Sequence, residues 1–347
     1  MAVMRRFAPL IIAGLVLAAA PITGPDIPAR VVEYVKPGEP PEATLVAVGD
    51  IMLSRTVGKR MRQYGAGYPF ANTTSLIQAA NIAFGNLETP ITPGPEVQPF
   101  EMVFRADTEA AGALKDAGFD ILSLANNHIP NLGPDGVLDT LHYLDGAGIM
   151  YVGAGKDAVE AGQPMFIIAN GIVFAFLAYN DSDIVPLSYE AGAGAGTALM
   201  RSDAMVKAVK GAKNFADIVI VSMHSGTEYE PLPNERQTRF AHAAIDAGAE
   251  MVIGHHPHVI QPAELYKGKH IFYSLGNFVF DQMWSRETRE GLAIAATFTR
   301  DGLVDIAYHP VLIEDYAQPR LLEGEEAAKI VEKATQGLPV DSSVTAP

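Results

Sequence analysis

The stretch EMVIGHHPH at residues 250–258 displays the pattern that decides the fold. An apolar run, typical of a buried strand, ends at a small residue, Gly254, and a cluster of polar side chains follows at once. Because the pattern recurs along the chain, it predicts several strands that each carry polar residues at their carboxyl end. The other runs are TLVAVGD (44–50), NIAFGNLE (81–88), DILSLANNH (120–128), DIVIVSMH (217–224) and HIFYSLGNFVFD (270–281).

Amphipathic stretches that end in glycine lie between these runs. Residues 109–118, 135–148 and 235–248 are predicted helices with glycine at the C-cap. Continuous apolar strands that alternate with helices indicate an α/β domain with internal sheet layers. Such folds place their chemistry where strands end at the carboxyl edge.

Composition excludes several classes of protein. The chain has 347 residues, of which 48% are hydrophobic, so it contains enough apolar material to fold into one large or two ordinary domains. A formal charge of −15 argues against a nucleic-acid binder that relies on general basic charge. The absence of cysteine excludes disulfides, thiolate metal sites and a thiol nucleophile.

The N-terminus predicts export. Arg5-Arg6 followed by the apolar run 10–20 is typical of a signal segment, either cleaved or retained as an anchor. The predicted organisation is a signal peptide or signal anchor (1–24), a Pro/Gly-rich linker (25–43), one α/β domain (44–322), and a terminal helix with a disordered tail (323–347). We therefore expect a periplasmic or other extracytoplasmic location.

Two further segments carry local predictions. The run AGAGAGT at 191–197 is too flexible for a strand interior, and we expect a surface loop that moves over the site. The stretch from Gly291 to Ile313 is predicted to form a hairpin that turns at Asp301-Gly302.

The polar clusters at the strand ends predict a metal site. Carboxylate, carboxamide and imidazole without thiolate suit one or two divalent ions, with Mn, Fe(II), Zn or Mg as candidates. Four other histidines, at 142, 242, 270 and 309, are interpreted as structural or surface residues. The candidate residues are Asp50, Glu88, Asn127, His128, His224, His256 and His258, with His255 beside them.

Each candidate also has an ordinary structural interpretation. Asp50, Glu88 or His128 taken singly is more typical of a turn, a helix cap or a solvated loop. Ser225 beside His224 is interpreted as incidental, because adjacent residues of a strand point to opposite faces. Three histidines within four residues have little packing purpose, so the joint pattern favours the metal site.

Eight sequence motifs, in the same order along the chain, resemble those of the poly-γ-glutamate capsule biosynthesis protein CapA family. The resemblance extends from about Thr44 to about Ile313. The resemblance implies a metallophosphatase-like four-layer α/β/β/α sandwich of mixed sheets flanked by helices. It also implies an extracytoplasmic, membrane-associated role in making or exporting poly-γ-glutamate, together with membrane-bound capsule synthase partners. The motifs are GDIMLSR (49–55), FGNLETPIT (84–92), FRAD (104–107), AGFDILSLANNH (117–128), GIMYVGAG (148–155), HSGTEYE (224–230), GHHPHVIQP (254–262) and YSLGNFVFDQ (273–282).

The same resemblance assigns roles and reveals departures. It implies a set of metal ligands with Glu88 as a substitute bridge, namely Asp50, Glu88, Asn127, His224, His256 and His258. We expect His128 to be a general acid or an electrostatic stabiliser of the leaving oxygen, and Asn127 is a second catalytic candidate. Met52 stands where the metallophosphoesterase pattern has a histidine, and Asn86 stands where it has a metal-bridging aspartate. Asn131 replaces an aspartate that the CapA motifs have after the Asn-Asn-His cluster. Further candidate site residues are Asn86, His255, Asn277 and Arg286, which lies near Trp284.

Three functional hypotheses follow from these residues. The first is a CapA-like protein of poly-γ-glutamate synthesis or export with a metal-dependent hydrolase or transferase site. The second keeps the fold as a metal-dependent phosphodiesterase or phosphatase unrelated to capsule. The third is a non-catalytic, polymer-binding scaffold, which the residues at Met52 and Asn86 favour.

Overall fold

The computed structural model describes residues 41–186, 189–192 and 194–338. The predicted signal segment and most of the predicted linker therefore lie outside the described residues, as does the predicted tail. The first strand, β1, begins at Ala43, one residue before the predicted start of the domain. Among the described helices, none combines the length and the apolar character that crossing a bilayer requires.

The larger sheet has eight strands and mixes parallel with antiparallel pairs. Strands β1 to β4 are parallel, β15 joins β1 in parallel, and the C-terminal strands pair antiparallel at the other side. In sheet order the strands are β18 (Gln318–Leu321), β17 (Gly302–Glu314), β16 (Glu290–Thr299), β1 (Ala43–Ile51), β2 (Ile82–Leu87), β3 (Ile121–Ser123) and β4 (Met150–Val152), with β15 (Asn277–Val279) beside β1.

The second sheet has six strands. Its centre, from β7 to β13, is parallel, and an antiparallel strand closes each edge. Two short pairs, β11 (Ile260–Gln261) with β14 (Ser274–Leu275) and β5 (Ala154–Gly155) with β8 (Gly196–Thr197), complete the strands. In order the six strands are β12 (Glu264–Tyr266), β13 (Lys269–Phe272), β10 (Met251–His255), β9 (Ile218–His224), β7 (Ile172–Asn180) and β6 (Met165–Ala169).

The two sheets pack face to face. On β1 the residues Leu45 and Ala47 belong to the core between the sheets, whereas Val46 and Val48 face the helical layer. Phe84 of the first sheet and Phe176 of the second stack at 5.7 Å in that central core. Each such fully buried ring stabilises the fold by about 1.5–3 kcal/mol relative to an exposed one.

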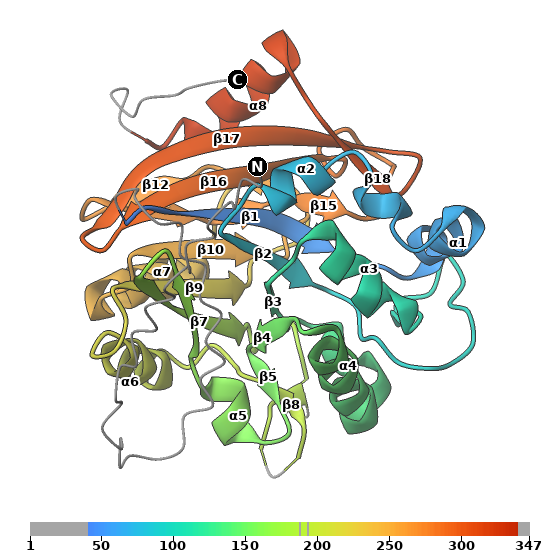
Figure 1. Cartoon of the computed structure of the whole chain (residues 1–347), viewed down its shortest axis with the longest axis horizontal. Coiled ribbons are helices and arrows are strands. Elements are labelled where there is room, and N and C mark those ends of the chain that lie inside the picture. The colour runs from blue at the N-terminus through green and yellow to red at the C-terminus, as the bar shows by residue number, and fades with distance from the viewer. Residues whose placement is uncertain (1–40, 187–188, 193, 339–347) are drawn as a thin grey trace, which may run out of the picture.

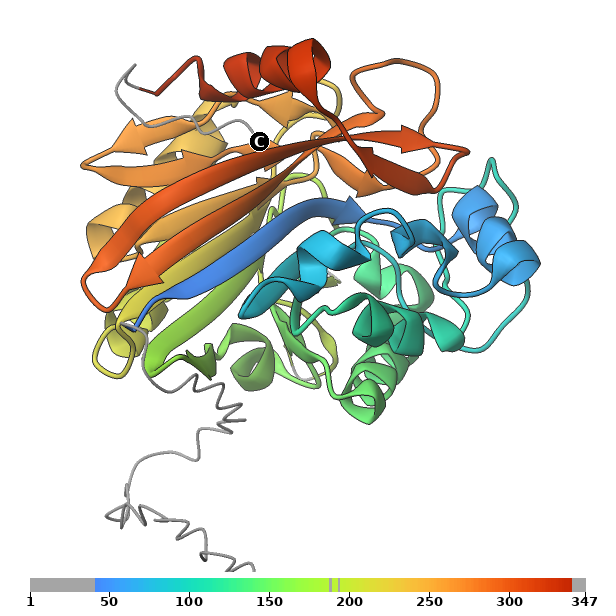
Figure 2. The same cartoon turned by 45° about the horizontal axis from the view of Figure 1, so that its top comes forward.

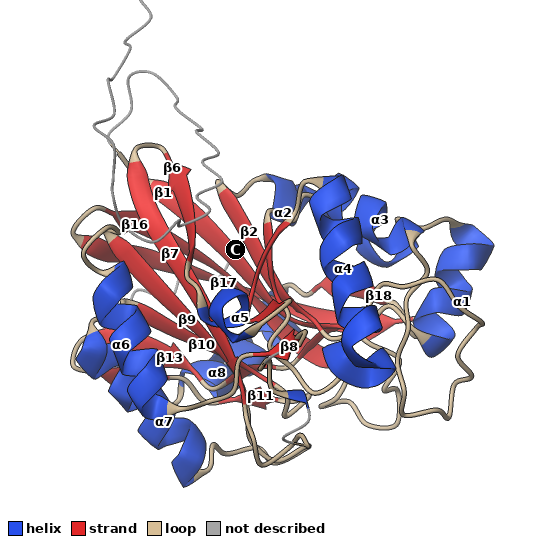
Figure 3. Cartoon of the chain, turned by 90° about the horizontal axis from the view of Figure 1, so that it is seen from below, coloured by secondary structure: helices blue, strands red, loops and turns tan. Residues whose placement is uncertain are grey.

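Helices cover both outer faces, as Figure 3 shows from below. Helices α1 to α4 pack against the larger sheet and α6 with α7 against the smaller one, so the predicted four-layer α/β/β/α sandwich is confirmed (Figure 1). The helices are α1 (Arg55–Tyr64), α2 (Thr74–Gln78), α3 (Glu109–Ala117), α4 (Gly133–Ala147), α5 (Ala158–Gly162), α6 (Ser202–Ala212), α7 (Glu235–Ala247) and α8 (Gly324–Thr335), with short 3-10 helices η1 (Tyr68–Phe70) and η2 (Ile129–Leu132).

The predicted helix ends and the C-terminal helix are confirmed. Helices α3, α4 and α7 each end at a glycine in the left-handed region, Gly118, Gly148 and Gly248. Helix α8 lies above the long β16–β17 hairpin in Figure 2. Its apolar side, which includes Ile330 and Val331, belongs to the core between the sheets.

The hairpin prediction is confirmed, and the loop prediction needs a correction. Thr299 pairs with Gly302, so the chain turns at Arg300 and Asp301, one residue before the predicted Asp301-Gly302. Within 191–197, Gly196 and Thr197 form β8, which pairs antiparallel with β5. A Cβ at Gly196 would lie 2.6 Å from the carbonyl oxygen of Tyr189, so this glycine serves a close backbone approach in a strand.

Candidate metal centre

The polar strand ends converge at one edge of the sandwich. Asp50 at the end of β1 is the register partner of Asn86 at the end of β2. In the other sheet, His224 at the end of β9 is the partner of His255 at the end of β10. Because these neighbouring strands are parallel, their carboxyl ends lie together, and the four buried side chains come from residues up to about 200 positions apart.

Two glycines that precede polar clusters, Gly49 and Gly254, permit this convergence. A Cβ on Gly49 would lie 2.0 Å from the carbonyl oxygen of Gly276, and a Cβ on Gly254 would lie 2.0 Å from that of Tyr273. Neither backbone contact can be relieved by rotating a side chain. The glycines therefore bring the backbone of the following segment against the strands that carry Asp50 and His255.

Glu88 lies at the centre of the cluster. Its side chain is 0% exposed, and neither carboxylate oxygen has a hydrogen-bond partner. Burial, and then the negative charges of Asp50 and Glu228, raise the pKa of Glu88 well above its ordinary value. A buried carboxylate without a donor is costly unless a cation compensates it. Three imidazole nitrogens surround Oε1, namely His224 Nε2 at 3.7 Å, His258 Nε2 at 3.8 Å and His128 Nε2 at 3.9 Å.

Asp50 is the opposite case, since donors contact both of its oxygens. Asn86 Nδ2 donates to Oδ1 at 2.9 Å, and the backbone N–H of His256 donates to Oδ2 at 3.2 Å. Burial raises the pKa of the Asp50 carboxyl, but the imidazoles of His255 and His258 together outweigh burial. The net result is a pKa well below the ordinary value. Asp50 is thus an anion that the protein itself neutralises.

The residues fit a divalent ion. Ligand atoms of Glu88, His256 and His258 lie within 4.8 Å of one another, and the same holds for Asp50, Glu88 and His224. Burial, and then the neighbouring His258, lower the pKa of His256 to about 3, so its imidazole is neutral at physiological pH. Its buried Nδ1 has no hydrogen-bond partner. Neutral imidazole and carboxylate are the ligand types that Zn, Fe(II) and Mn accept.

His128 lies at the rim of this cluster with its ring fixed on two sides. Its ring stacks on Phe104 at 3.8 Å, and Nδ1 lies 2.9 Å from Asn131 Oδ1. Asn131 Oδ1 also accepts the backbone N–H of Phe104, so it acts as an acceptor and His128 donates from Nδ1. Burial lowers the pKa of His128 to about 4. Its Nε2, which points toward Glu88, is therefore a proton acceptor.

The structure also brings three further predicted residues to the cluster. Asn127 Oδ1 accepts from His224 Nε2 at 2.9 Å, and Asn277 Oδ1 lies 2.9 Å from His258 Nδ1. His255 is fully buried, with Nδ1 3.3 Å from Asp50 Oδ1. Asn127 and Asn277 orient candidate ligands through these hydrogen bonds, whereas neither ring nitrogen of His255 has a hydrogen-bond partner.

Arg286 has its contacts elsewhere. Its guanidinium pairs with Glu290 at 2.7 Å and with Glu326 of α8 at 3.0 Å. Trp284, which is 64% exposed, meets only the edge of Tyr229 among the ring contacts of the described residues. Met52 is buried, and its Sδ accepts the backbone N–H of Ser54 at 3.1 Å, so it supplies no oxygen or nitrogen ligand.

Sequence reasoning missed Arg55 and Asn126. Arg55 is buried, forms an ion pair with Asp281, and places its guanidinium 4.6 Å from the centre of the Phe104 ring. Its backbone has φ 49°, a strained value for a non-glycine residue. Asn126 is fully buried beside Asn86 and Leu87. The residue type of neither side chain indicates a place in the site, because both contact partners that are distant in sequence.

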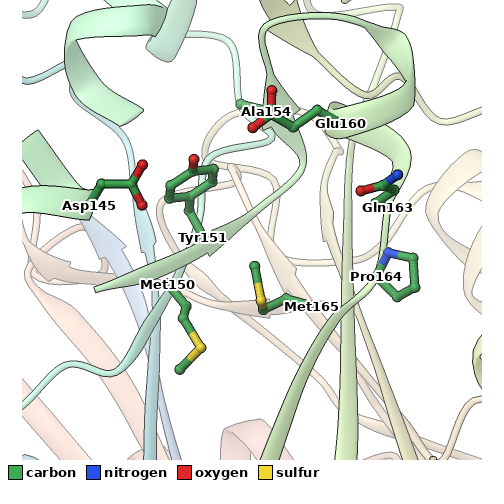
Figure 4. Close-up of a pocket in the computed structure, with 8 residues that line it drawn as sticks. All are labelled: Asp145, Met150, Tyr151, Ala154, Glu160, Gln163, Pro164 and Met165. Atoms are coloured by element: carbon green, nitrogen blue, oxygen red, sulfur yellow. The ribbon is translucent and has the colours of Figure 1, made fainter. Parts of the chain in front are cut away.

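A cavity of about 450 Å³ opens onto the cluster at Asn127 and His256. Its wall carries three acids, Asp181, Asp183 and Glu228, and Arg236, which pairs with both aspartates. A second cavity, of about 220 Å³, lies between edge strands β4 and β6 (Figure 4). Its carboxylates belong to Asp145 and Glu160, and no residue of the metal cluster lines it. Of these two cavities, the first gives a ligand access to the cluster.

Comparisons with known proteins match this arrangement. Residues 44–282 match the family described as "Bacterial capsule synthesis protein PGA_cap". The chain is 34% identical over 294 residues to "Capsule biosynthesis protein CapA" of Bacillus anthracis, covering 81% of this chain and 70% of the relative. It is 35% identical over 271 residues to "PGA biosynthesis protein CapA" of Bacillus subtilis (strain 168), covering 77% and 71%.

Solved structures support the fold. A putative 5'-nucleotidase from Staphylococcus aureus superposes with a TM-score of 0.50 at 13% identity, over 84% of this chain and 58% of that one. NAD nucleotidase (NadN) from Haemophilus influenzae gives a TM-score of 0.50 at 10% identity, over 84% and 55%. At these identities the similarity concerns the metallophosphoesterase-like architecture alone.

Proposed function

The chain belongs to the bacterial capsule synthesis protein (PGA_cap) family, and on that premise we propose that it is an exported, divalent-metal-dependent hydrolase or transferase of poly-γ-glutamate synthesis. The proposal joins two kinds of support. Two relatives carry names that refer to capsule or PGA biosynthesis. The cluster around Glu88 has the ligand types of a hydrolytic metal site.

The observation that carries the proposal is the unpartnered carboxylate of Glu88. A carboxylate that is 0% exposed, has no donor, and lies near three imidazole nitrogens has no structural role that would stabilise the fold. A divalent cation would neutralise it. A purely scaffolding protein would have no reason to retain such a group in its interior.

The residues around the cavity have distinct tasks in this proposal. A bound divalent ion would polarise the scissile carbonyl or phosphoryl oxygen of the substrate. His128 would accept a proton at Nε2, since its Nδ1 donates to Asn131 and its pKa is about 4. Phe104 excludes water from one face of that ring. The cavity of about 450 Å³ would admit one or two units of a polymer.

The substrate and the location are part of the same proposal. Poly-γ-glutamate is anionic and the chain has a net charge of −15, so a cation at the cluster would supply the local attraction. Export rests on the signal-like segment around Arg5-Arg6 and the apolar run 10–20. Membrane-bound synthase components are the partners that the proposal requires.

Incubation of the purified chain with poly-γ-glutamate tests the proposal. In the presence of Mn²⁺ or Zn²⁺ we expect the polymer to shorten on a gel and new amino groups to appear. Glu88→Gln should abolish both signals. Glu250→Gln, a buried carboxylate paired with Lys269 at the opposite end of β10, is the matched control and should retain them.

Other results would identify the alternatives. Turnover of chromogenic phosphoesters without any effect on the polymer would favour a phosphoesterase unrelated to capsule. A chain that purifies without metal, and whose Glu88→Gln variant restores capsule to a deletion strain, would favour a scaffold. Either result contradicts the proposed activity.

A further inference from the structure

The amide of Asn126 has a single possible orientation. Its Nδ2 donates to the carbonyl oxygen of Leu87 at 2.8 Å, and its Oδ1 accepts the backbone N–H groups of His128 at 3.1 Å and Ile129 at 3.0 Å. A carbonyl oxygen can only accept and a backbone N–H can only donate. Exchange of the oxygen and nitrogen of Asn126 would therefore break all three hydrogen bonds.

Asn126 in turn orients Asn86. The Nδ2 group of Asn126 also donates to Asn86 Oδ1 at 3.1 Å, so the Nδ2 group of Asn86 faces the cluster. There it lies 2.9 Å from Asp50 Oδ1 and 3.2 Å from His224 Nδ1. A hydrogen-bond donor thus occupies the place where the metallophosphoesterase pattern has a metal-bridging carboxylate.

This orientation decides the tautomer of His224. Because Asn86 donates to Nδ1, that nitrogen carries a lone pair, and the proton of the neutral ring is on Nε2. Nε2 then donates to Asn127 Oδ1 at 2.9 Å. One nitrogen of His224 is occupied by an amide and the other carries a proton, so neither is free to bind a cation.

Asn277 imposes the opposite arrangement on His258. Its Nδ2 donates to the carbonyl oxygen of Thr288 at 2.8 Å and to Gln282 Oε1 at 3.0 Å, which leaves Oδ1 toward His258 Nδ1 at 2.9 Å. His258 therefore donates from Nδ1, which leaves Nε2 as its ligand atom. Nε2 lies 3.8 Å from Glu88 Oε1. Orientation of a ligand histidine through its second nitrogen is common in metal sites.

We propose that this chain binds one divalent ion through Glu88, His256 and His258, and that Asn86 prevents binding of a second. The three ligand atoms lie within 4.8 Å of one another, and both the Glu88 oxygens and His256 Nδ1 lack other partners. Two imidazoles and one carboxylate form a single-ion set that leaves coordination positions open for substrate. Asp50 and His224 are positioning residues. Each Asp50 oxygen has two nitrogen neighbours within 3.4 Å, and both ring nitrogens of His224 face protein amides.

The inference rests on the proposed function for the presence of a metal but makes a separate claim about number. We would load the full chain with Mn²⁺, remove excess ion by gel filtration, and measure bound metal by mass spectrometry. We expect one ion per chain and the six-line electron paramagnetic resonance spectrum of an isolated Mn²⁺. Two ions per chain with an exchange-coupled spectrum would overturn the inference and leave the proposed function intact. No bound ion would overturn both.

Three variants test the assigned roles. Asn86→Asp replaces the blocking donor by a carboxylate and should raise the stoichiometry to two. His224→Gln should weaken Mn²⁺ binding by about 10–100-fold, as expected for loss of a positioning contact, whereas His258→Gln, which removes a ligand, should weaken it by more than that. Equal losses in the two histidine variants, both folded by circular dichroism, would contradict the assignment.

Discussion

Removal of the charge on Glu88 should stabilise the metal-free protein. The ligand atoms of Glu88 and Asp50 lie within 4.8 Å, and two like charges at that separation repel by about 3.5 kcal/mol at an effective dielectric constant of 20. Glu88→Gln keeps the shape and removes this repulsion. Because the raised pKa of Glu88 already relieves part of the cost by protonation, we expect a gain of about 1–3 kcal/mol in the free energy of unfolding.

The same variant should lose the response to metal. An ion present at 100 times its dissociation constant stabilises a folded protein by about 2.7 kcal/mol. At about 2.1 cal/mol/K of unfolding entropy per residue, a folded domain of roughly 290 residues should then gain roughly 4–5 °C in Tm. With saturating Mn²⁺ the wild type should therefore melt higher than it does without metal, while Glu88→Gln should not shift. The order of the two melting curves should reverse on adding metal.

Glu250 provides the matched control. Its carboxylate is buried like that of Glu88 but pairs with Lys269 Nζ and accepts the backbone N–H of Leu303. Glu250→Gln should destabilise the metal-free protein and leave the Mn²⁺ shift unchanged. Thermal unfolding of the three proteins with and without Mn²⁺ gives the comparison. A less stable metal-free Glu88→Gln, or an equal Mn²⁺ shift in all three proteins, would refute the role assigned to Glu88.

Three further predictions concern His128 and the strand ends. Asn131→Asp places a carboxylate beside His128 Nδ1 and should raise the pKa of that imidazole from about 4 by 1–2 units, which a proton NMR titration of the ring would detect. The pKa of His128 is about 4 in the folded state and 6.5 in the unfolded chain, so the unfolded state binds protons first as the pH falls. Between pH 7 and pH 5 the metal-free wild type should therefore lose about 2 kcal/mol more stability than His128→Gln does. Equal losses of the two proteins in chemical denaturation would exclude this contribution. Gly49→Ala forces a Cβ to within 2.0 Å of the Gly276 carbonyl oxygen and should destabilise the protein by about 3 kcal/mol in the same assay, whereas Gly146→Ala, which meets no atom within 4 Å, should not destabilise it.

The sequence pattern predicted the fold well because strand ends and helix caps are local signals. A glycine after an apolar run, such as Gly254, is the next-to-last residue of its strand, and a glycine such as Gly118 marks the end of a helix. The pattern failed at Gly196 and Thr197, where composition suggested a loop. Their pairing with β5 is a non-local contact. The residues whose backbone packs closely against Gly196, such as Tyr189, cannot be identified from the spacing of residues in the sequence.

The site was predicted by residue type but not by role. Imidazoles and carboxylates at strand ends indicated a metal site, and the structure brings Asp50, Glu88 and the histidines together. Arg286, which the sequence placed among the further candidates, instead pairs with Glu290 and Glu326. A side chain with several possible partners takes the one that the fold brings within reach, and the sequence does not state which.

The number of ions that the site binds is the property that depends most directly on which groups donate and which accept hydrogen bonds. Asn at position 86 has a donor NH2 group where Asp would have an acceptor oxygen. Backbone groups orient the amide of Asn126, and Asn126 in turn decides which way the donor of Asn86 faces. Those backbone groups are the carbonyl of Leu87 at the end of β2 and the N–H groups of His128 and Ile129 after β3. The chain keeps its family membership at 34–35% identity to the relatives, whereas in our proposal the capacity for a second ion depends on a single amide. Relatives with a carboxylate at the position of Asn86 would therefore share this fold and still differ from this chain in metal content.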